Sequence, residues 1–139
     1  PPLALIKSIE LSGCSVVEDD YALVNRFLTE DVPTEGDPLD ALVGAYLRAS
    51  VETSCKYVPE AANKGSFHLE QVRRSGAEGV IYATPSFCDP ALLDRPMICG
   101  RLSREGVPHI AFKYAENTGQ MQPIREQAGT FADSIKLWS

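Results

Sequence analysis

The sequence lacks any long apolar run, because no segment reaches the roughly 18 apolar residues that a membrane-spanning helix needs. It also lacks an initiator methionine, and its first residues carry neither the basic nor the apolar region of a signal or transit peptide. We therefore expect a soluble, cytoplasmic segment that has been cut from a longer chain.

Basic residues are scarce relative to acidic ones. The chain has 13 Lys and Arg against 19 Asp and Glu, for a net charge of −6. Binding to nucleic acid or to an anionic membrane surface requires clustered positive charge. The composition therefore argues against both kinds of partner.

Paired metal-ligand motifs are also lacking. The cysteines and histidines are Cys14, Cys55, Cys88, Cys99, His68 and His109, and no two of the cysteines form a CxxC pair. A self-contained zinc site therefore has no support. In a reducing compartment such cysteines remain thiols or bind metal, and each is equally well explained as a small buried apolar residue.

Strand and helix signals alternate along the chain, which has the length of one ordinary domain. Apolar patterns predict strands at residues 3–11, 79–84 and 107–114. They predict helices at residues 18–28, 37–47, 66–75, 89–106 and 121–138, with an interruption or kink at Pro96 and an undecided segment at 50–62.

This order predicts an α/β fold. A strand, helix, strand crossover is almost always right-handed, so consecutive strands lie parallel with helices on both faces. We expect residues 1–139 to form a single domain, a three-layer sandwich with a mostly parallel, flavodoxin-like sheet.

Three loops should meet at the carboxyl edge of this sheet, where open α/β folds bind ligands. They are residues 12–15, 85–90 and 115–120. In the middle loop Cys88 precedes Asp89, a helix-capping residue, and Pro90 at the first helical position. A thiol at a helix N-terminus experiences partial positive charge, which lowers its pKa and favours the thiolate.

The third loop has hydrogen-bonding side chains around a glycine, namely Glu116, Asn117 and Gln120, and it suits an oxygen-rich ligand. Arg125, one turn into the last helix, is a candidate for binding a phosphate group or the middle loop. An ion pair with Glu116 explains it equally well. Asp-Pro and Asn-Thr before helices are also ordinary caps, so these residues alone indicate only a cleft.

Several stretches carry a resemblance to a known family: Gly79-Val80-Ile81, Phe87-Cys88-Asp89-Pro90, and Gly106-Val107-Pro108-His109 followed by Glu116 and Gly119-Gln120. They resemble the C-terminal region of the benzoyl-CoA reductase and 2-hydroxyacyl-CoA dehydratase family. Residues 112–125 are more similar to the benzoyl-CoA reductase branch, gamma-type subunit. The resemblance implies the C-terminal half of a longer subunit whose N-terminal domain is absent.

The resemblance also implies a cofactor. Each of two related subunits of this family holds a [4Fe–4S] cluster through two cysteines of the N-terminal domain and one of the C-terminal domain. By this resemblance Cys88 is the third ligand, and Ser86, Asn117 and Gln120 are candidates to donate hydrogen bonds to sulfur. Cys14 does not match a ligand of the family, and Cys55 and Cys99 are interpreted as packing residues.

The activity implied by the resemblance is reduction of the aromatic ring of benzoyl-CoA. Ferredoxin supplies the electrons and activator-like partner subunits hydrolyse ATP, which agrees with the lack of a Walker motif in this chain. The other implied partner is the paralogous cluster-bearing subunit.

Three alternatives remain open. The first is a 2-hydroxyacyl-CoA dehydratase subunit, which uses the same cluster to expel a hydroxyl group. The second is a flavodoxin-like binding or assembly domain without chemistry, for which Cys88→Ser has no effect. The third is thiol redox chemistry at Cys88, with Cys14 as the resolving cysteine.

Overall fold

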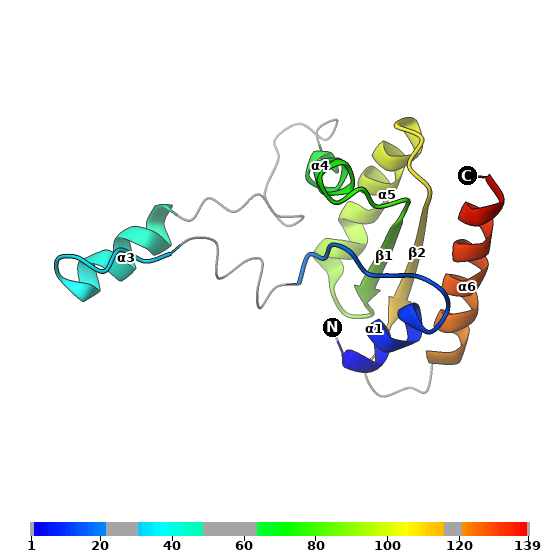
Figure 1. Cartoon of the computed structure of the whole chain (residues 1–139), viewed down its shortest axis with the longest axis horizontal. Helices are drawn as coiled ribbons and strands as arrows, with labels where there is room; N and C mark the ends of the chain where they lie inside the picture. The colour runs from blue at the N-terminus through cyan, green and yellow to red at the C-terminus, as the bar shows by residue number, and fades with distance from the viewer. Residues whose placement is uncertain (1, 22–30, 49–63, 116–120, 139) are drawn as a thin grey trace. The chain divides into compact units, whose positions relative to one another are not determined.

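The structure is a computed structural model that describes residues 2–21, 31–48, 64–115 and 121–138. Its elements are α1 (Leu3–Glu10), α3 (Pro38–Arg48), α4 (Ser66–Ser75), β1 (Val80–Pro85), α5 (Asp89–Arg104), β2 (His109–Tyr114) and α6 (Met121–Trp138) (Figure 1). The chain forms two compact units, Pro1–Glu18 with Tyr57–Ser139, and Asp19–Lys56. The sequence predicts a helix at residues 18–28, but its first residues, 18–21, are not helical, and the rest of it lies outside the described residues, as does the undecided segment at 50–62.

The prediction of a first strand at residues 3–11 is wrong, because this segment forms helix α1. Leu5 and Ile9 are 2% and 8% exposed, whereas Leu3 and Leu11 are 83% and 57% exposed. Residues four apart lie on one face of a helix. Leu5 and Ile9 therefore form the buried face of a helix. Several of the apolar residues stand at odd-numbered positions, two residues apart, which is why the pattern also fits the period of a strand.

Strands β1 and β2 form a parallel two-stranded sheet, as the sequence predicted for consecutive strands. The register pairs Val80 with His109 and Pro85 with Tyr114. Helix α5 makes the connection between them, so it runs antiparallel to both strands. Both strands therefore end at the same edge, where the turn before α5 begins.

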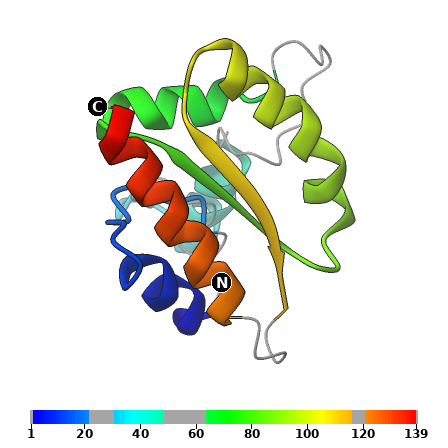
Figure 2. The ribbon, with the colours of Figure 1, turned by 90° about the vertical axis from the view of Figure 1, so that its right-hand side faces the viewer.

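One face of the sheet is covered by α1 and α6 (Figure 2). Phe112 and Tyr114 of β2 pack there with Leu5 of α1 and with Ile124 and Ala128 of α6. All five side chains are at most 7% exposed, so this face holds the larger of the two apolar clusters.

The opposite face is covered by α4 and α5. Leu69 of α4 joins Ile98 and Leu102 of α5 in a second cluster, and Val80 and Tyr82 of β1 pack against it. Ile98 and Leu102 are fully buried. The described part of the chain is thus an α/β arrangement with helices on both faces of a small parallel sheet.

Gly79 allows α6 to approach the start of β1. A Cβ atom at this position would lie 2.7 Å from Cζ of Phe131 and 2.8 Å from Cδ1 of Ile135. Real Cβ atoms do not approach other carbons so closely, because cores are already packed at crystal density. The absence of a side chain at Gly79 therefore sets the distance between helix and sheet.

The start of α3 and the end of α4 agree with the capping residues seen in the sequence. Asp37 accepts hydrogen bonds through Oδ1 from the N–H groups of Leu39 and Asp40, at 2.9 and 3.1 Å. Gly76 ends α4 in the left-handed conformation, with φ of 67°. Helix α5 continues through Pro96 without interruption, and Ile98 and Leu102, beyond the proline, belong to the second cluster that packs against the sheet.

Candidate functional site

The carboxyl end of β1 turns directly into α5 at Cys88. The N–H of Cys88 donates to the carbonyl oxygen of Pro85 at 3.0 Å, and the Cys88 carbonyl accepts from the N–H of Leu92 at 3.0 Å. Cys88 is therefore the N-cap residue, and Asp89 lies inside the first turn instead of capping it. The half-buried thiol stands at the positive end of a 16-residue helix.

Tyr82 fixes the start of α5 against β1. Its hydroxyl donates to the carbonyl oxygen of Ala91 at 3.1 Å, which lies in the first turn of the helix. The ring of His68 lies 6.0 Å from the Tyr82 ring. The position of Cys88 thus depends on a contact between strand and helix as well as on the turn.

Ser86 links the ends of the two strands. Both its N–H and its hydroxyl donate to the carbonyl oxygen of Tyr114, at 2.9 and 3.0 Å. The sequence suggested Ser86 as a donor to sulfur. In this structure its hydroxyl proton is already committed to Tyr114, so its role is to close the edge of the sheet.

Thr84 is the polar residue of this region that sequence reasoning missed. It is 1% exposed, and its Oγ1 has no hydrogen-bond partner in the described part of the chain. Burying a hydroxyl without a partner costs about 1–3 kcal/mol. The available signal was a polar residue two positions after Tyr82, on the strand face that is otherwise apolar.

Exposed apolar side chains lie beside Cys88 and along α5. Phe87 is 95% exposed, and Leu93 and Met97 are 74% and 37% exposed. Lys113, which is paired with Thr84 in the sheet register, is also exposed and is a cation at the same edge. The described surface near the thiol therefore combines apolar area with charged side chains of both signs, since Asp89 is also exposed.

The remaining predicted site residues are only partly described. Arg125 lies on the exposed side of α6, and the structure gives it no ion pair with a described residue. Glu116, Asn117 and Gln120 lie outside the described residues. Their suggested roles remain predictions.

Cys14 does not lie beside Cys88, so the expected meeting of the 12–15 loop with the 85–90 loop is wrong. Its Sγ donates to the carbonyl oxygen of Ala128 at 3.8 Å, and it packs against the cluster under α1 and α6. Cys88 begins α5 on the opposite face of the sheet. Because residues 3–11 form a helix and not a strand, the following loop runs along α6. The two thiols are therefore not placed for exchange.

The surroundings of Cys99 and of His109 indicate a structural role for both residues. Burial raises the pKa of the Cys99 thiol above its ordinary value of 9.0, and nearby Arg95 offsets part of this shift. This favours a neutral packing residue at Cys99. His109, at the opposite edge of the sheet from Cys88, has its Nδ1 2.9 Å from the carbonyl oxygen of Val107.

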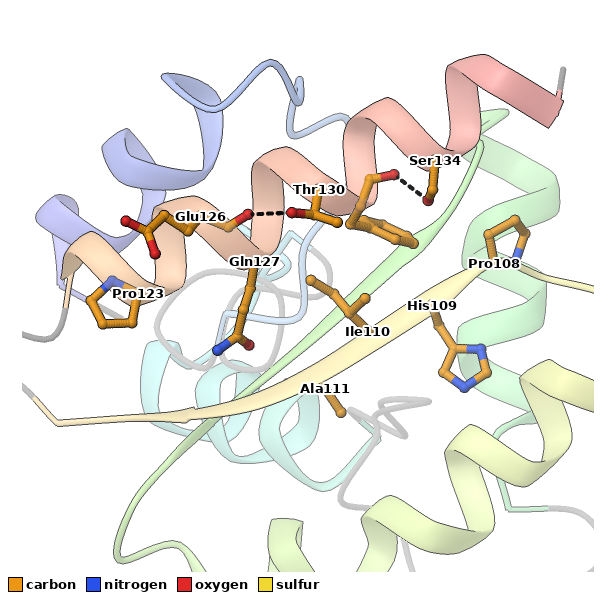
Figure 3. A pocket seen from close by; sticks show the side chains of 10 residues that line it. Pro108, His109, Ile110, Ala111, Pro123, Glu126, Gln127, Thr130 and Ser134 are labelled. Carbon is orange, nitrogen blue, oxygen red and sulfur yellow. Dashed lines mark hydrogen bonds between the residues drawn. The ribbon is translucent and has the colours of Figure 1, made fainter.

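A groove lies between β2 and α6, lined by Pro108, His109, Ile110, Ala111, Pro123, Glu126, Gln127, Thr130, Phe131 and Ser134 (Figure 3). Its hydroxyl groups are already used within the helix. Thr130 donates to the carbonyl oxygen of Glu126 at 3.0 Å and Ser134 to that of Phe131 at 2.7 Å. With its hydroxyl groups already used and no cysteine in its lining, the groove is a weaker candidate than the Cys88 turn.

Among the residues that the structure describes, no three His, Cys, Asp or Glu side chains are grouped so that they could hold a metal ion. None of the helices in this part of the chain combines the length and the apolar character needed to cross a bilayer.

Comparison with known proteins gives the family. Residues 1–135 match the model of the family described as 2-hydroxyglutaryl-CoA dehydratase, D-component. The chain belongs to this family. Its 2-hydroxyacyl-CoA dehydratase and benzoyl-CoA reductase branches are the ones that the sequence resembled. No solved structure matches the chain.

Relatives of the chain within the family include a benzoyl-CoA reductase subunit and subunits of 2-hydroxyacyl-CoA dehydratases. A benzoyl-CoA reductase subunit of Thauera aromatica is 65% identical over 139 residues, which is 100% of this chain and 36% of that protein. The beta subunit of (R)-phenyllactyl-CoA dehydratase of Clostridium sporogenes is 26% identical over 94% of the chain and 34% of its own length. The beta subunit of (R)-2-hydroxyglutaryl-CoA dehydratase of Acidaminococcus fermentans is 28% identical over 94% of the chain and 35% of its length. The chain therefore spans about a third of the length of these family members.

Proposed function

We propose that this chain is part of a cluster-bearing subunit of an ATP-driven benzoyl-CoA reductase. The observation that carries the proposal is the 65% identity over the whole chain to a benzoyl-CoA reductase subunit, against 26% and 28% to the two dehydratase subunits. In this proposal the complex delivers low-potential electrons to the aromatic ring of benzoyl-CoA in the cytoplasm.

The complete subunit would be longer than this chain, which covers 36% of the reductase relative. We propose that residues 1–139 belong to its C-terminal α/β domain. The parallel pair β1 and β2, with helices on both faces, would then be part of a larger flavodoxin-like sheet in a three-layer sandwich. Further strands would come from the rest of the subunit.

Within this chain, Cys88 is the proposed ligand of a [4Fe–4S] cluster, and two further cysteines would come from the N-terminal domain. Its surroundings suit a cluster. The thiol is half-buried at the start of α5, and the preceding strand β1 holds the buried hydroxyl of Thr84, which has no partner among the described residues. The cluster, when bound, would supply one-electron reduction at low potential.

The side chains of this chain would hold and shield that centre. The Tyr82 hydroxyl fixes the first turn of α5 through the Ala91 carbonyl, and Ser86 closes the adjacent strand ends. Phe87, exposed beside Cys88, would cover the thiolate and exclude water once the rest of the subunit is present. Glu116, Asn117, Gln120 and Arg125 are the candidates for contacts to the substrate.

The partners follow from the same proposal. A paralogous subunit would hold the second cluster, and activator-like subunits would hydrolyse ATP and pass on electrons from ferredoxin. The substrate would be an aromatic acyl-CoA, whose adenosine phosphates are anionic. Lys113 and Arg125 are exposed cations of this chain that suit such phosphates.

Anaerobic analysis of the full-length subunit, expressed with its partners, tests the ligand assignment. Cys88→Ser should lower the iron content by about one cluster and abolish benzoyl-CoA reduction, because serine binds iron poorly. Cys99→Ser is the matched control, since Cys99 lies on the same helix but packs away from its start, and it should leave both quantities unchanged. Unchanged iron and activity in Cys88→Ser would contradict the proposal.

The same preparation distinguishes the alternatives. Activity toward a 2-hydroxyacyl-CoA in place of benzoyl-CoA, with the same dependence on Cys88, would assign the chain to the dehydratase branch that the family description names. A complex without iron and without an effect of Cys88→Ser would instead leave a binding or assembly domain.

A further inference from the structure

The buried hydroxyl of Thr84 is the unexplained polar group of this edge. Thr84 is 1% exposed, and its Oγ1 has no hydrogen-bond partner in the described part of the chain. A hydroxyl is rarely buried without a partner in a native structure, because it loses its bonds to water and gains nothing in return. We therefore expect the Thr84 hydroxyl to donate a hydrogen bond to an acceptor outside the described residues.

The strand pattern places Thr84 on the α5 side of the sheet. Val80 and Tyr82 of β1 pack against the cluster formed by α4 and α5, and side chains two residues apart share a face of a strand. Thr84 continues this row toward the carboxyl edge. Ile81 and Ala83, between them, pack on the other face.

The contact of Tyr82 with α5 shows which part of the helix Thr84 lies beside. The Tyr82 hydroxyl reaches the Ala91 carbonyl, and Thr84 lies about 7 Å further along the strand. Helix α5 runs in the opposite direction, so moving from Ala91 back to Cys88 covers about 5 Å the same way. The hydroxyl is thus level with the start of the helix, where Cys88 is the N-cap.

We infer that Thr84 is a positioning residue whose hydroxyl donates a hydrogen bond to sulfur of the iron–sulfur cluster held by Cys88. The inference rests on the proposed function. Thiolate and sulfide are acceptors and not donors, and the Thr84 hydroxyl has a proton that no described residue takes. Ser86, which the sequence suggested for this role, already donates to Tyr114.

Such a bond would tune the electron affinity of the centre. Reduction adds negative charge to the sulfurs, so a donated hydrogen bond stabilises the reduced form more than the oxidised form. Removing the donor should make the cluster harder to reduce. Thr84→Val removes the hydroxyl at nearly constant volume, and Thr84→Ser retains it.

The test is a redox titration of the full-length subunit with its partners, followed by electron paramagnetic resonance. In Thr84→Val we expect the iron content to be retained and the ratio of reduced to oxidised cluster, at a fixed potential, to fall on the order of tenfold. Tenfold corresponds to about 59 mV for a one-electron couple, toward more negative potential. Thr84→Ser should remain close to the wild type.

Each other outcome is also decisive. Equal potentials in wild type, Thr84→Val and Thr84→Ser would overturn the inference while leaving Cys88 as a ligand. Loss of iron in Thr84→Val but not in Thr84→Ser would support it, and loss in both would overturn it. If Cys88→Ser retains all iron, the proposed function itself fails.

Thermal unfolding of the cluster-free subunit distinguishes a hydrogen bond from the Thr84 hydroxyl to the protein from a hydrogen bond to the cluster. If the hydroxyl has no protein partner, Thr84→Val should leave the melting temperature unchanged or raise it, because an unsatisfied buried hydroxyl is removed. A clear fall in melting temperature, reversed in Thr84→Ser, would show that the hydroxyl bonds to the protein and would overturn the inference.

Discussion

The hydroxyl of Tyr82 donates to the carbonyl oxygen of Ala91 at 3.1 Å and so joins β1 to the first turn of α5. This bond connects the sheet with the helix whose N-cap is Cys88. It shows that the position of the thiol is determined by tertiary contact and not by the turn at residues 85–88 alone.

Tyr82→Phe should therefore lower the free energy of unfolding by about 1 kcal/mol, the usual net contribution of such a bond. Urea unfolding of the full-length subunit measures this change. Tyr46→Phe is the control, because Tyr46 is 79% exposed and its substitution should have no measurable effect. Equal midpoints for the two variants would show that the Tyr82 bond contributes nothing.

Gly79→Ala should destabilise the protein by about 1–3 kcal/mol, because the new methyl group meets Phe131 and Ile135 at less than 3 Å. Gly100→Ala provides the contrast. Gly100 lies within α5, and a Cβ there meets nothing within 4 Å. Alanine at this position should stabilise the helix by about 0.5–1 kcal/mol. Urea midpoints that shift in the same direction for both variants would contradict the close approach of α6 to β1.

Cys99 should make stability depend on alkaline pH. Burial raises the pKa of its thiol in the folded state above the ordinary 9.0, so the unfolded chain loses the proton first. The stabilising contribution is complete below that value and is lost as the pH rises through the folded pKa. Urea midpoints at about pH 8 and about pH 10 should differ more in the wild type than in Cys99→Ser. An identical pH dependence in both proteins would show that Cys99 is not responsible.

Phe87→Ser should shorten the lifetime of the cluster in air without changing stability. Phe87 is 95% exposed in this chain, so its loss removes little packing here, but in the proposed complex it covers the Cys88 sulfur. The decay of visible absorption after exposure to air measures the effect. Leu11→Ser, at an exposed position after α1, is the control and should leave the lifetime unchanged. Equal lifetimes for the two variants would exclude a covering role.

The sequence alone determined the local elements that have strong capping and apolar signals. Asp37 before Pro38 predicted the start of α3, Gly76 the end of α4, and the apolar run after Gly79 the strand β1. The sequence also placed Cys88 at a helix start, because Asp89 and Pro90 favour the first turn of a helix. These are short-range effects that neighbouring residues decide.

Tertiary structure decided what local patterns leave open. Residues 3–11 fit a strand as well as a helix by spacing, and packing of Leu5 and Ile9 beside α6 selects the helix. That choice also moves Cys14 away from Cys88. The buried state of Thr84 likewise exists only once α5 covers β1, because the burial of a hydroxyl is a property of the elements packed around it and not of its neighbours in sequence.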